Sequence, residues 1–376
     1  MNQSKISKIA KHLCKLWSLH GLPIFTLKNG KFVNKPTKSY IFSLLFVAVV
    51  VAIYTRIKKF DNRVYSYITT IQFFSIFLLN TGFIICSHRK RKKIEKIFAN
   101  LLHAETMVHR FSGDKFPSSK IGRNLLIYII FQFMLTLVQF VSVTSTLSRD
   151  NLSLYFEILC HQCLLTYSFN FNIMIFFFLF SLREIGKHFV GAIQAKMSHK
   201  VLDREFRQVM EISTLLHNVA NDVHQTFQLV LLLKIFKDFI LAVSSAYHSA
   251  FTMANLTTVL SYLRNITEVG VFLFATLMSN FGMVYYFDEI SKQDVNLMEI
   301  MDEILISFKD DLIVSYKSVE LFDLRLKNRN STFYVCGLFP LNCTFIYTMI
   351  AGMASYMIYL VQFTQVQQKD STVSNN

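Results

Sequence analysis

The stretch YVCGLFPLNCTFIYTMIAGMASYMIYLVQF, residues 334–363, decides the fold class of this chain. No Asp, Glu, Lys or Arg occurs from Asn330 to Gln368, a length that exceeds the roughly 20 residues one helix needs to cross a bilayer. Pro340 lies inside the stretch, and a proline interrupts a helix because it has no backbone N–H. We therefore predict a short first piece, a break near Pro340 and a full membrane span from about Thr344.

Composition extends this prediction to the whole chain. Its 376 residues are 52% hydrophobic and include 38 Phe, and the mean hydropathy is +0.37. Six further blocks lack charged residues, and each is near or above the ~17-residue minimum for a span. They are residues 39–55, 64–87, 124–148, 158–182, 239–263 and 269–287. The sequence thus predicts an all-α, polytopic membrane protein with seven transmembrane helices.

The basic residues predict the orientation of these spans. With seven spans, the N-terminus shares one side of the membrane with residues 88–123, 183–238 and 288–329. That side holds 32 of the 39 Lys and Arg residues. Loops rich in Lys and Arg stay in the cytoplasm. We therefore predict an inside N-terminus, an outside C-terminus and a multi-pass location in the plasma membrane.

Two of the predicted cytoplasmic loops carry apolar stripes at helical spacing. The stripes consist of Phe206, Val209, Met210, Ser213, Leu216, Ala220, Val223, Phe227 and Val230, and of Leu297, Met301, Ile304, Phe308, Leu312, Ser315, Val319 and Phe322. A helix from Ile212 through Leu263 would be about 75 Å long, well beyond a ~30 Å hydrocarbon core. We predict that the helices extend into a cytosolic bundle that also joins subunits. Packing within one chain is the alternative.

The N-terminal region is basic and amphipathic. Lys5, Lys8, Lys11 and Lys15 alternate with apolar residues at helical spacing, which predicts a helix on the anionic inner leaflet, or else a plain basic flank. The predicted organisation has five parts: a basic cytoplasmic N-terminus (1–38), six spans with the ligand-pocket region (39–287), a cytosolic helix with a short re-entrant piece (288–343), the seventh span (344–366) and an extracellular tail (367–376).

Polar residues inside the spans are candidates for an outward-facing pocket that binds a small organic ligand. These candidates are His161, Gln162, Thr166, Tyr167, Asn170, Asn255, Tyr262, Tyr67 and Gln72. Hydrogen bonds between helices are the alternative role for each of them. Asn151 and Asn265 begin glycosylation motifs on the predicted outer side. We expect no enzyme activity, no cofactor, no metal site and no nucleic-acid partner, because the corresponding motifs are missing from the sequence.

The end of the last span resembles a known signature. Ser355-Tyr356, five apolar residues and Gln362-Phe363 resemble the Thr/Ser-Tyr and Gln-Phe motif that ends the last span of insect gustatory receptors. The resemblance implies a ligand-gated cation channel of four subunits, identical or mixed, in a lipid membrane. Each subunit would then contribute its last span to the pore, with Ser355, Tyr356, Tyr359, Gln362 and Phe363 as pore and gate residues. Sugar receptors of that family often carry Glu at the position of Met357, so a non-sugar, aversive tastant is expected.

Other classes of membrane protein fit the sequence less well. A seven-span receptor that couples to G proteins would have the opposite orientation, and no Asp-Arg-Tyr-like triplet follows the third span. A small-solute transporter is disfavoured because the spans hold no acidic residues and the two halves do not repeat. An odorant-receptor-type channel shares the predicted architecture and stays open as an alternative.

Overall fold

The computed structural model describes residues 5–19, 24–28, 31–35, 63–113, 118–145, 152–197, 203–253, 259–307, 316–329 and 332–374. Within these ranges the chain forms nine helices and two small antiparallel hairpins, so it is all-α as predicted. The helices are α1 (Lys5–Leu19), α3 (Arg63–Arg89), α4 (Arg91–Ser112), α5 (Ser118–Ser145), α6 (Leu152–Met197), α7 (Asp203–Met253), α8 (Val259–Ser307), α9 (Tyr316–Lys327) and α10 (Cys343–Ser374). The strands are β1 (Ile24–Lys28), β2 (Lys31–Lys35), β3 (Tyr334–Val335) and β4 (Phe339–Pro340). The predicted span 39–55 lies outside the described residues.

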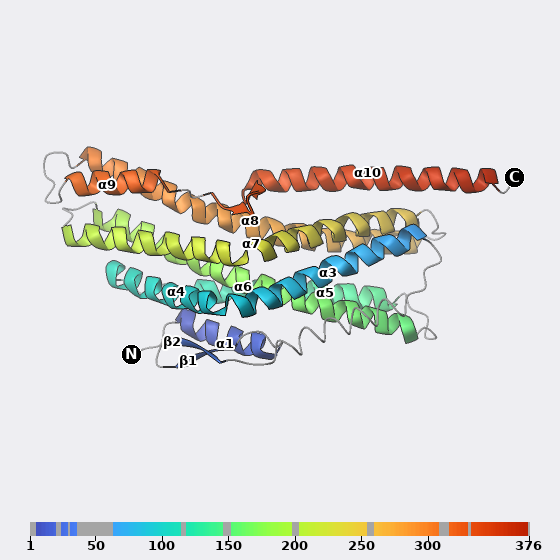
Figure 1. Ribbon diagram of the computed structural model, residues 1–376, viewed down its shortest axis with the longest axis horizontal. Coiled ribbons are helices and arrows are strands. Elements are labelled where there is room, and N and C mark those ends of the chain that lie inside the picture. The colour runs from blue at the N-terminus through green and yellow to red at the C-terminus, as the bar shows by residue number, and fades with distance from the viewer. Residues whose placement is uncertain are drawn as a thin grey trace.

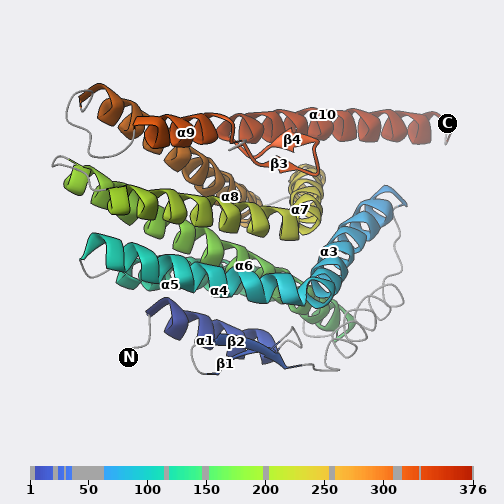
Figure 2. The ribbon, with the colours of Figure 1, turned by 60° about the vertical axis from the view of Figure 1, so that its left-hand side comes forward.

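The long helices run along the long axis of the molecule (Figure 1). Helices α1, α4 and α9 gather toward one end, and the C-terminal end of α10 lies at the other. Figure 2 shows α10 on one side of the bundle, next to α7 and α8, with α1 and its hairpin on the opposite side. The chain segments predicted to be cytoplasmic therefore collect at one end of the bundle.

Three helices are longer than a membrane is thick. Helices α6, α7 and α8 contain 46, 51 and 49 residues, which corresponds to about 70–75 Å at ~1.5 Å per residue. These lengths exceed the ~30 Å hydrocarbon core, as the sequence predicts, and the extension into the cytosol stays a prediction. The predicted helix from Ile212 through Leu263 is wrong at its end, because α7 stops at Met253 and α8 starts at Val259. The five residues between them contain no Gly, Pro or charge, so the signal for this reversal is weak and consists of Asn255, a turn residue, and of Thr257 and Thr258, which favour the start of a helix.

Helix α6 forms the centre of the core. All ten side chains from Ile173 to Leu182 are buried, as expected of a helix that is apolar on every side. The ring of Phe98 on α4 lies 5.7 Å from that of Phe177 and 4.9 Å from that of Phe178. Each buried Phe contributes about 1.5–3 kcal/mol, so this aromatic cluster is a main source of the fold's stability.

The apolar face of α1 packs against protein. Ile6, Ala10, Leu13 and Trp17 are buried, and the Trp17 ring lies 6.2 Å from the ring of Phe98. The prediction that this face lies on the inner leaflet is therefore wrong. An amphipathic pattern identifies the apolar face of a helix, but a protein surface and a lipid surface satisfy it equally well.

The two apolar stripes pack within one chain wherever the structure describes them. In α7, Phe206, Val209, Val223 and Phe227 are buried, and the ring of Phe206 meets that of Phe322 on α9 edge-on at 5.8 Å. The described members of the stripe around Leu216 pack against their own chain, which favours the alternative of packing within one chain, and the subunit contact stays a prediction. Phe308 and Leu312 lie outside the described residues.

The predicted break near Pro340 is confirmed. Before the break, β3 pairs with β4 around a tight turn in which Cys336 and Gly337 have positive φ values of 49° and 75°. Helix α10 then begins at Cys343, one residue before the predicted start. Within the described residues, two helical segments are long and apolar enough to cross a membrane by composition alone, Thr70–Arg89 and Cys343–Gln362.

Candidate functional site

Helix α10 has little contact with the rest of its own chain. Only 11% of its apolar segment Cys343–Gln362 is buried, compared with 44% of Thr70–Arg89 in α3. Ile346 and Met349 are buried on the side that faces α7 and α8. The ring of Phe239 on α7 packs next to Gly352, at a distance that would leave a Cβ there in ordinary van der Waals contact, 3.4 Å from the ring. The remaining surface of α10 is open to other partners.

One exposed face of α10 is polar. Thr344, Thr348, Ser355 and Gln362 are exposed and follow each other at spacings of four, seven and seven residues, which places them on one face of a helix. We call these four residues the outer stripe. The hydroxyl of Ser355 donates to the carbonyl of Ala351 at 2.9 Å, and that of Thr348 to the carbonyl of Thr344 at 3.3 Å. Both hydroxyls are thus satisfied while their oxygen atoms can still accept hydrogen bonds.

Helix α5 provides a comparison. Between Leu126 and Leu137, every exposed side chain that the structure describes is apolar: Leu126, Ile127, Ile130, Phe133, Met134 and Leu137. Such a surface suits lipid, whereas polar side chains at membrane depth face protein or water. Helix α10 exposes the outer stripe together with three tyrosines, Tyr347 (74% exposed), Tyr356 (58%) and Tyr359 (69%). Its surface is therefore suited to contact with further protein or with an aqueous pore.

The candidate pore residues all lie on α10. Ser355, Tyr356, Tyr359 and Gln362 are exposed, and the Tyr356 ring also meets the ring of Phe239 edge-on at 5.5 Å. Tyr356 thus faces a neighbouring helix of its own chain while part of it stays open. Phe363 is within α10, but its side chain lies outside the described part.

The structure describes the side chains of two candidate pocket residues. Asn170 on α6 is buried, and the amide of Gln72 on α3 donates to the hydroxyl of Ser244 on α7. Gln72 therefore joins two helices. Tyr67, His161, Gln162, Thr166, Tyr167 and Tyr262 lie in helices with side chains outside the described part, as does the glycosylation candidate Asn265. Asn255 and Asn151 lie outside the described residues.

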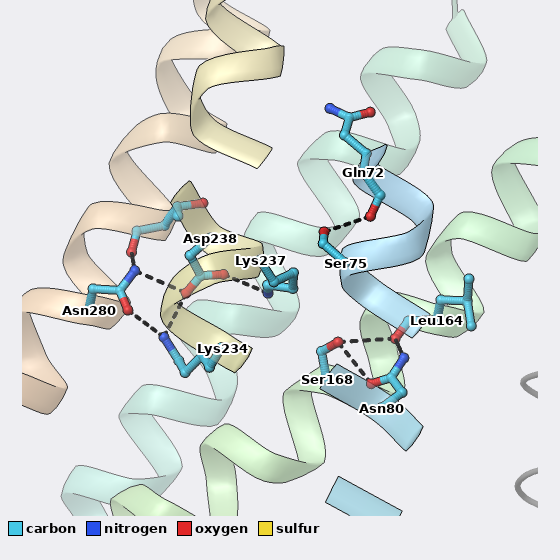
Figure 3. Close-up of polar contacts among 10 residues, drawn as sticks. Gln72, Ser75, Asn80, Leu164, Ser168, Lys234, Lys237, Asp238 and Asn280 are labelled. Atoms are coloured by element: carbon cyan, nitrogen blue, oxygen red, sulfur yellow. Dashed lines mark hydrogen bonds and ion pairs between the residues drawn. The ribbon is translucent and has the colours of Figure 1, made fainter. Parts of the chain in front are cut away.

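Sequence reasoning missed a buried polar pair between α3 and α6. The amide nitrogen of Asn80 donates to the carbonyl of Leu164 at 2.9 Å, and the hydroxyl of Ser168 donates to the amide oxygen of Asn80 at 3.0 Å (Figure 3). Asn80 and Ser168 are both buried. Their hydrogen bonds fix the register of two core helices, since an unpaired buried amide would be costly.

A buried charge cluster joins α7 to α8 and was also missed (Figure 3). The Nζ of Lys234 lies 2.7 Å from Oδ2 of Asp238 and 2.7 Å from Oδ1 of Asn280. Asn280 donates its amide to Asp238 at 2.9 Å, and the Nζ of Lys237 lies 2.6 Å from the second carboxylate oxygen. Lys234 is 1% exposed. The cluster therefore holds two buried ammonium groups on one carboxylate.

The sequence does contain a signal for this cluster. Lys234, Lys237 and Asp238 interrupt the otherwise apolar run 229–243, LVLLLKIFKDFILAV. A count of charges ends a span at its first charged residue, and the sequence therefore places these residues in a loop. Charges within an apolar run instead indicate a partner on a neighbouring helix, which here is Asn280.

The fold is a bundle of long helices whose last helix, α10, is long and apolar enough to cross a membrane and buries few of its side chains. A profile of the 7tm Chemosensory receptor family matches residues 13–367. The chain therefore belongs to the chemosensory receptor family, and the predicted resemblance is confirmed at this level. No protein among the curated sequences matches the chain.

Solved structures of the same fold agree with this assignment. The insect olfactory receptor OR5 from Machilis hrabei in complex with eugenol superposes with a TM-score of 0.71 at 14% identity, over 95% of this chain and 98% of that one. A second structure of that receptor gives a TM-score of 0.66 at 12% identity with the same coverage. The chain thus has the seven-span chemoreceptor fold.

Proposed function

We propose that this protein is a gustatory-type receptor subunit whose last helix lines the pore of a ligand-gated, non-selective cation channel. The observation that carries the proposal is the outer stripe of α10, which faces away from α7 and α8. Four copies arranged around an axis would turn their stripes toward a common path. Hydroxyl and amide oxygens along such a path can partly replace the hydration of a passing cation.

The proposed orientation has the N-terminus inside and the C-terminus outside the plasma membrane of a sensory cell. It is supported by the distribution of Lys and Arg, with 32 of 39 on the predicted inner side. It is also supported by the arrangement in Figure 1, where α1 and the end of α10 lie toward opposite ends of the molecule.

The proposed ligand is a small organic tastant that binds among the outer halves of the spans. The olfactory receptor of the same fold was solved in complex with eugenol, which is also a small organic molecule. Met357 stands where the gustatory resemblance places Glu in sugar receptors, which favours a non-sugar ligand. An odorant-receptor-type channel is the second candidate function, because the matching solved structures are olfactory receptors.

Cysteine accessibility tests the pore assignment. Thr348→Cys and Ser355→Cys lie on the outer stripe, whereas Met353→Cys lies on the face that packs against the chain and serves as the control. The variants would be expressed alone and with candidate partner subunits, and currents recorded under a panel of small organic compounds. A membrane-impermeant, cationic thiol reagent should block current in the two stripe variants and spare the control. Equal block of all three would contradict a pore along this stripe.

A further inference from the structure

The connector from α9 to α10, residues 328–342, determines where the pore helix begins. Helix α10 buries few of its own side chains, so its position depends on how the preceding segment of the chain is held. The connector includes Arg329, Phe333 and the β3–β4 hairpin. Its described residues contact α7 and α8 at two separate places, one polar and one aromatic.

Arg329 makes the polar contact. Its guanidinium donates to the hydroxyl of Ser213 at 2.8 Å and to that of Thr214 at 3.0 Å, both on α7. The same group lies 3.6 Å from Oδ1 of Asp294 on α8, and the Arg329 side chain is 12% exposed. A planar guanidinium with several fixed donors suits such a site, where one side chain bridges two helices.

Asp294 extends the polar contact. Its other carboxylate oxygen lies 2.9 Å from Nδ1 of His217, one turn along α7 from Ser213. Arg329 therefore binds α7 directly through Ser213 and Thr214. It binds α8 through the carboxylate of Asp294, which His217 of α7 holds in place. We call Arg329, Ser213, Thr214, Asp294 and His217 the connector clamp. The clamp ties the end of the α9 segment to both long helices.

The aromatic contact lies further along the connector. The ring of Phe333 is buried between His224, at 5.3 Å, and Phe287, at 5.2 Å. The backbone of Leu341 donates to the carbonyl of Phe333 at 2.7 Å, and the side chain of Leu341 is buried. Leu341 precedes α10 by two residues, so the contact of Phe333 with α7 and α8 also fixes the position at which the pore helix starts.

A small cavity separates the two contacts. It has a volume of about 30 Å³, and Ser213, His217, Asp294 and Phe333 are among its lining residues.

From these contacts we infer that Arg329 is a positioning residue for the pore helix: its clamp docks the connector, and with it the start of α10, onto α7 and α8. Release of the clamp frees α10 to shift within the assembly and raises the ligand-free current. The rise in ligand-free current rests on the proposed channel function, whereas the docking of the connector onto α7 and α8 does not.

Thiol labelling of purified full-length protein tests the docking. Leu341→Cys places a thiol at a buried position, and the native Cys336, exposed in the hairpin turn, serves as an internal reference. Mass spectrometry would give the labelling rate at position 341 relative to that at Cys336. Arg329→Gln should raise this ratio roughly tenfold, because a buried site loses charge-assisted hydrogen bonds. Arg325→Gln, on the exposed face of α9, should leave it unchanged.

Two further variants separate positioning from a general loss of stability. Arg329→Lys keeps the charge but not the planar fork, so it should restore part of the slow labelling. Asp294→Asn combined with Arg329→Gln should label little faster than Arg329→Gln alone, because both changes break one clamp. An unchanged ratio in Arg329→Gln, or equal ratios in Arg329→Gln and Arg325→Gln, would overturn the inference.

The current measurement tests the link to the pore. Whole-cell current without ligand, normalised to surface protein, should rise several-fold in Arg329→Gln and not in Arg325→Gln. Faster labelling with unchanged or smaller current, in cells where the wild type conducts, would overturn the coupling to the pore. Absence of current in every variant and in the wild type, with any partner subunit, would instead contradict the proposed channel, while the labelling ratio still decides the docking.

Discussion

Asp238 binds two buried lysines, so the stability of the α7–α8 contact depends on one carboxylate. In Asp238→Asn the charge of Lys234 and Lys237 is left without its counter-charge in a buried site. Removal of one partner of a buried ion pair costs about 3–5 kcal/mol, so the thermal midpoint of the detergent-purified protein should fall clearly. Size-exclusion chromatography after heating would measure it.

Asp302→Asn is the matched control for this substitution. Asp302 lies 3.5 Å from Lys327, but half of its side chain is exposed, and exposed pairs contribute little. Its midpoint should equal that of the wild type. Equal midpoints for Asp238→Asn and Asp302→Asn would show that the buried cluster does not stabilise the fold.

The protonation of His224 makes the stability of the fold depend on pH. Burial lowers the pKa of His224, although a hydrogen bond with the backbone of Tyr334 partly offsets this. The unfolded chain, where the pKa is near its ordinary value of 6.5, then takes up the proton first as the pH falls. The stability from neutral His224 is therefore complete above pH 6.5 and is lost as the pH falls through the lower, folded-state value.

Thermal midpoints at about pH 7.5 and about pH 5.5 would check this expectation. His224→Gln should lose less stability between the two values than the wild type does, because it cannot be protonated. His103→Gln, at an exposed position of α4, should behave like the wild type. The same pH response in all three proteins would assign the effect to other groups.

At the scale of elements, α10 was well predicted and α7 was not. Pro340 and the missing charges fix the start of α10 within one residue. The end of α7 was missed because an apolar block of 25 residues, 239–263, satisfies the length of one span and hides a reversal inside it. Amphipathic stripes gave the buried faces of α1 and α7 correctly, but a stripe does not encode whether its partner is lipid, another subunit or the same chain.

The outer stripe of α10 leads to a prediction on conduction. Gln362 lies about five turns from Thr344 on the same face. Gln362→Ala should change single-channel conductance or ion selectivity, because it removes an amide that can contact a passing ion. Leu360→Ala removes apolar bulk just over half a turn away, on a different face of α10, and should change neither property. Recordings in which both variants conduct like the wild type would place Gln362 outside the pore.

Phe363 leads to a separate prediction on gating. If a ring of four phenyl groups closes the pore by excluding water, Phe363→Ala should admit water and raise the current in the absence of ligand. The measurement is whole-cell current normalised to surface protein, again with Leu360→Ala as the control. A leak equal to that of the wild type, with the ligand response retained, would show that the gate lies elsewhere.

For the whole molecule, the testable property is orientation. A reporter fused after Asn376 should be accessible on intact cells, and one fused before Met1 should become accessible only after permeabilisation. Detection of both on the same face would contradict the seven-span arrangement. The fold itself was predictable because it depends on where charge-free blocks and basic loops fall, and such patterns persist at the 14% identity that separates this chain from a receptor of the same fold.

Helix α10 contacts its own chain through one face, so the residues of its two faces are under different evolutionary constraints. Changes at Ile346 or Met349 must be matched by changes in α7 or α8, so that face evolves together with the rest of the subunit. On the opposite face, the residues are constrained only by the molecules that contact that face. If α10 lines a pore shared with other subunits, as proposed, substitutions at a few positions of that face can alter what the pore conducts, or which subunits assemble, while the folding of the subunit itself stays intact.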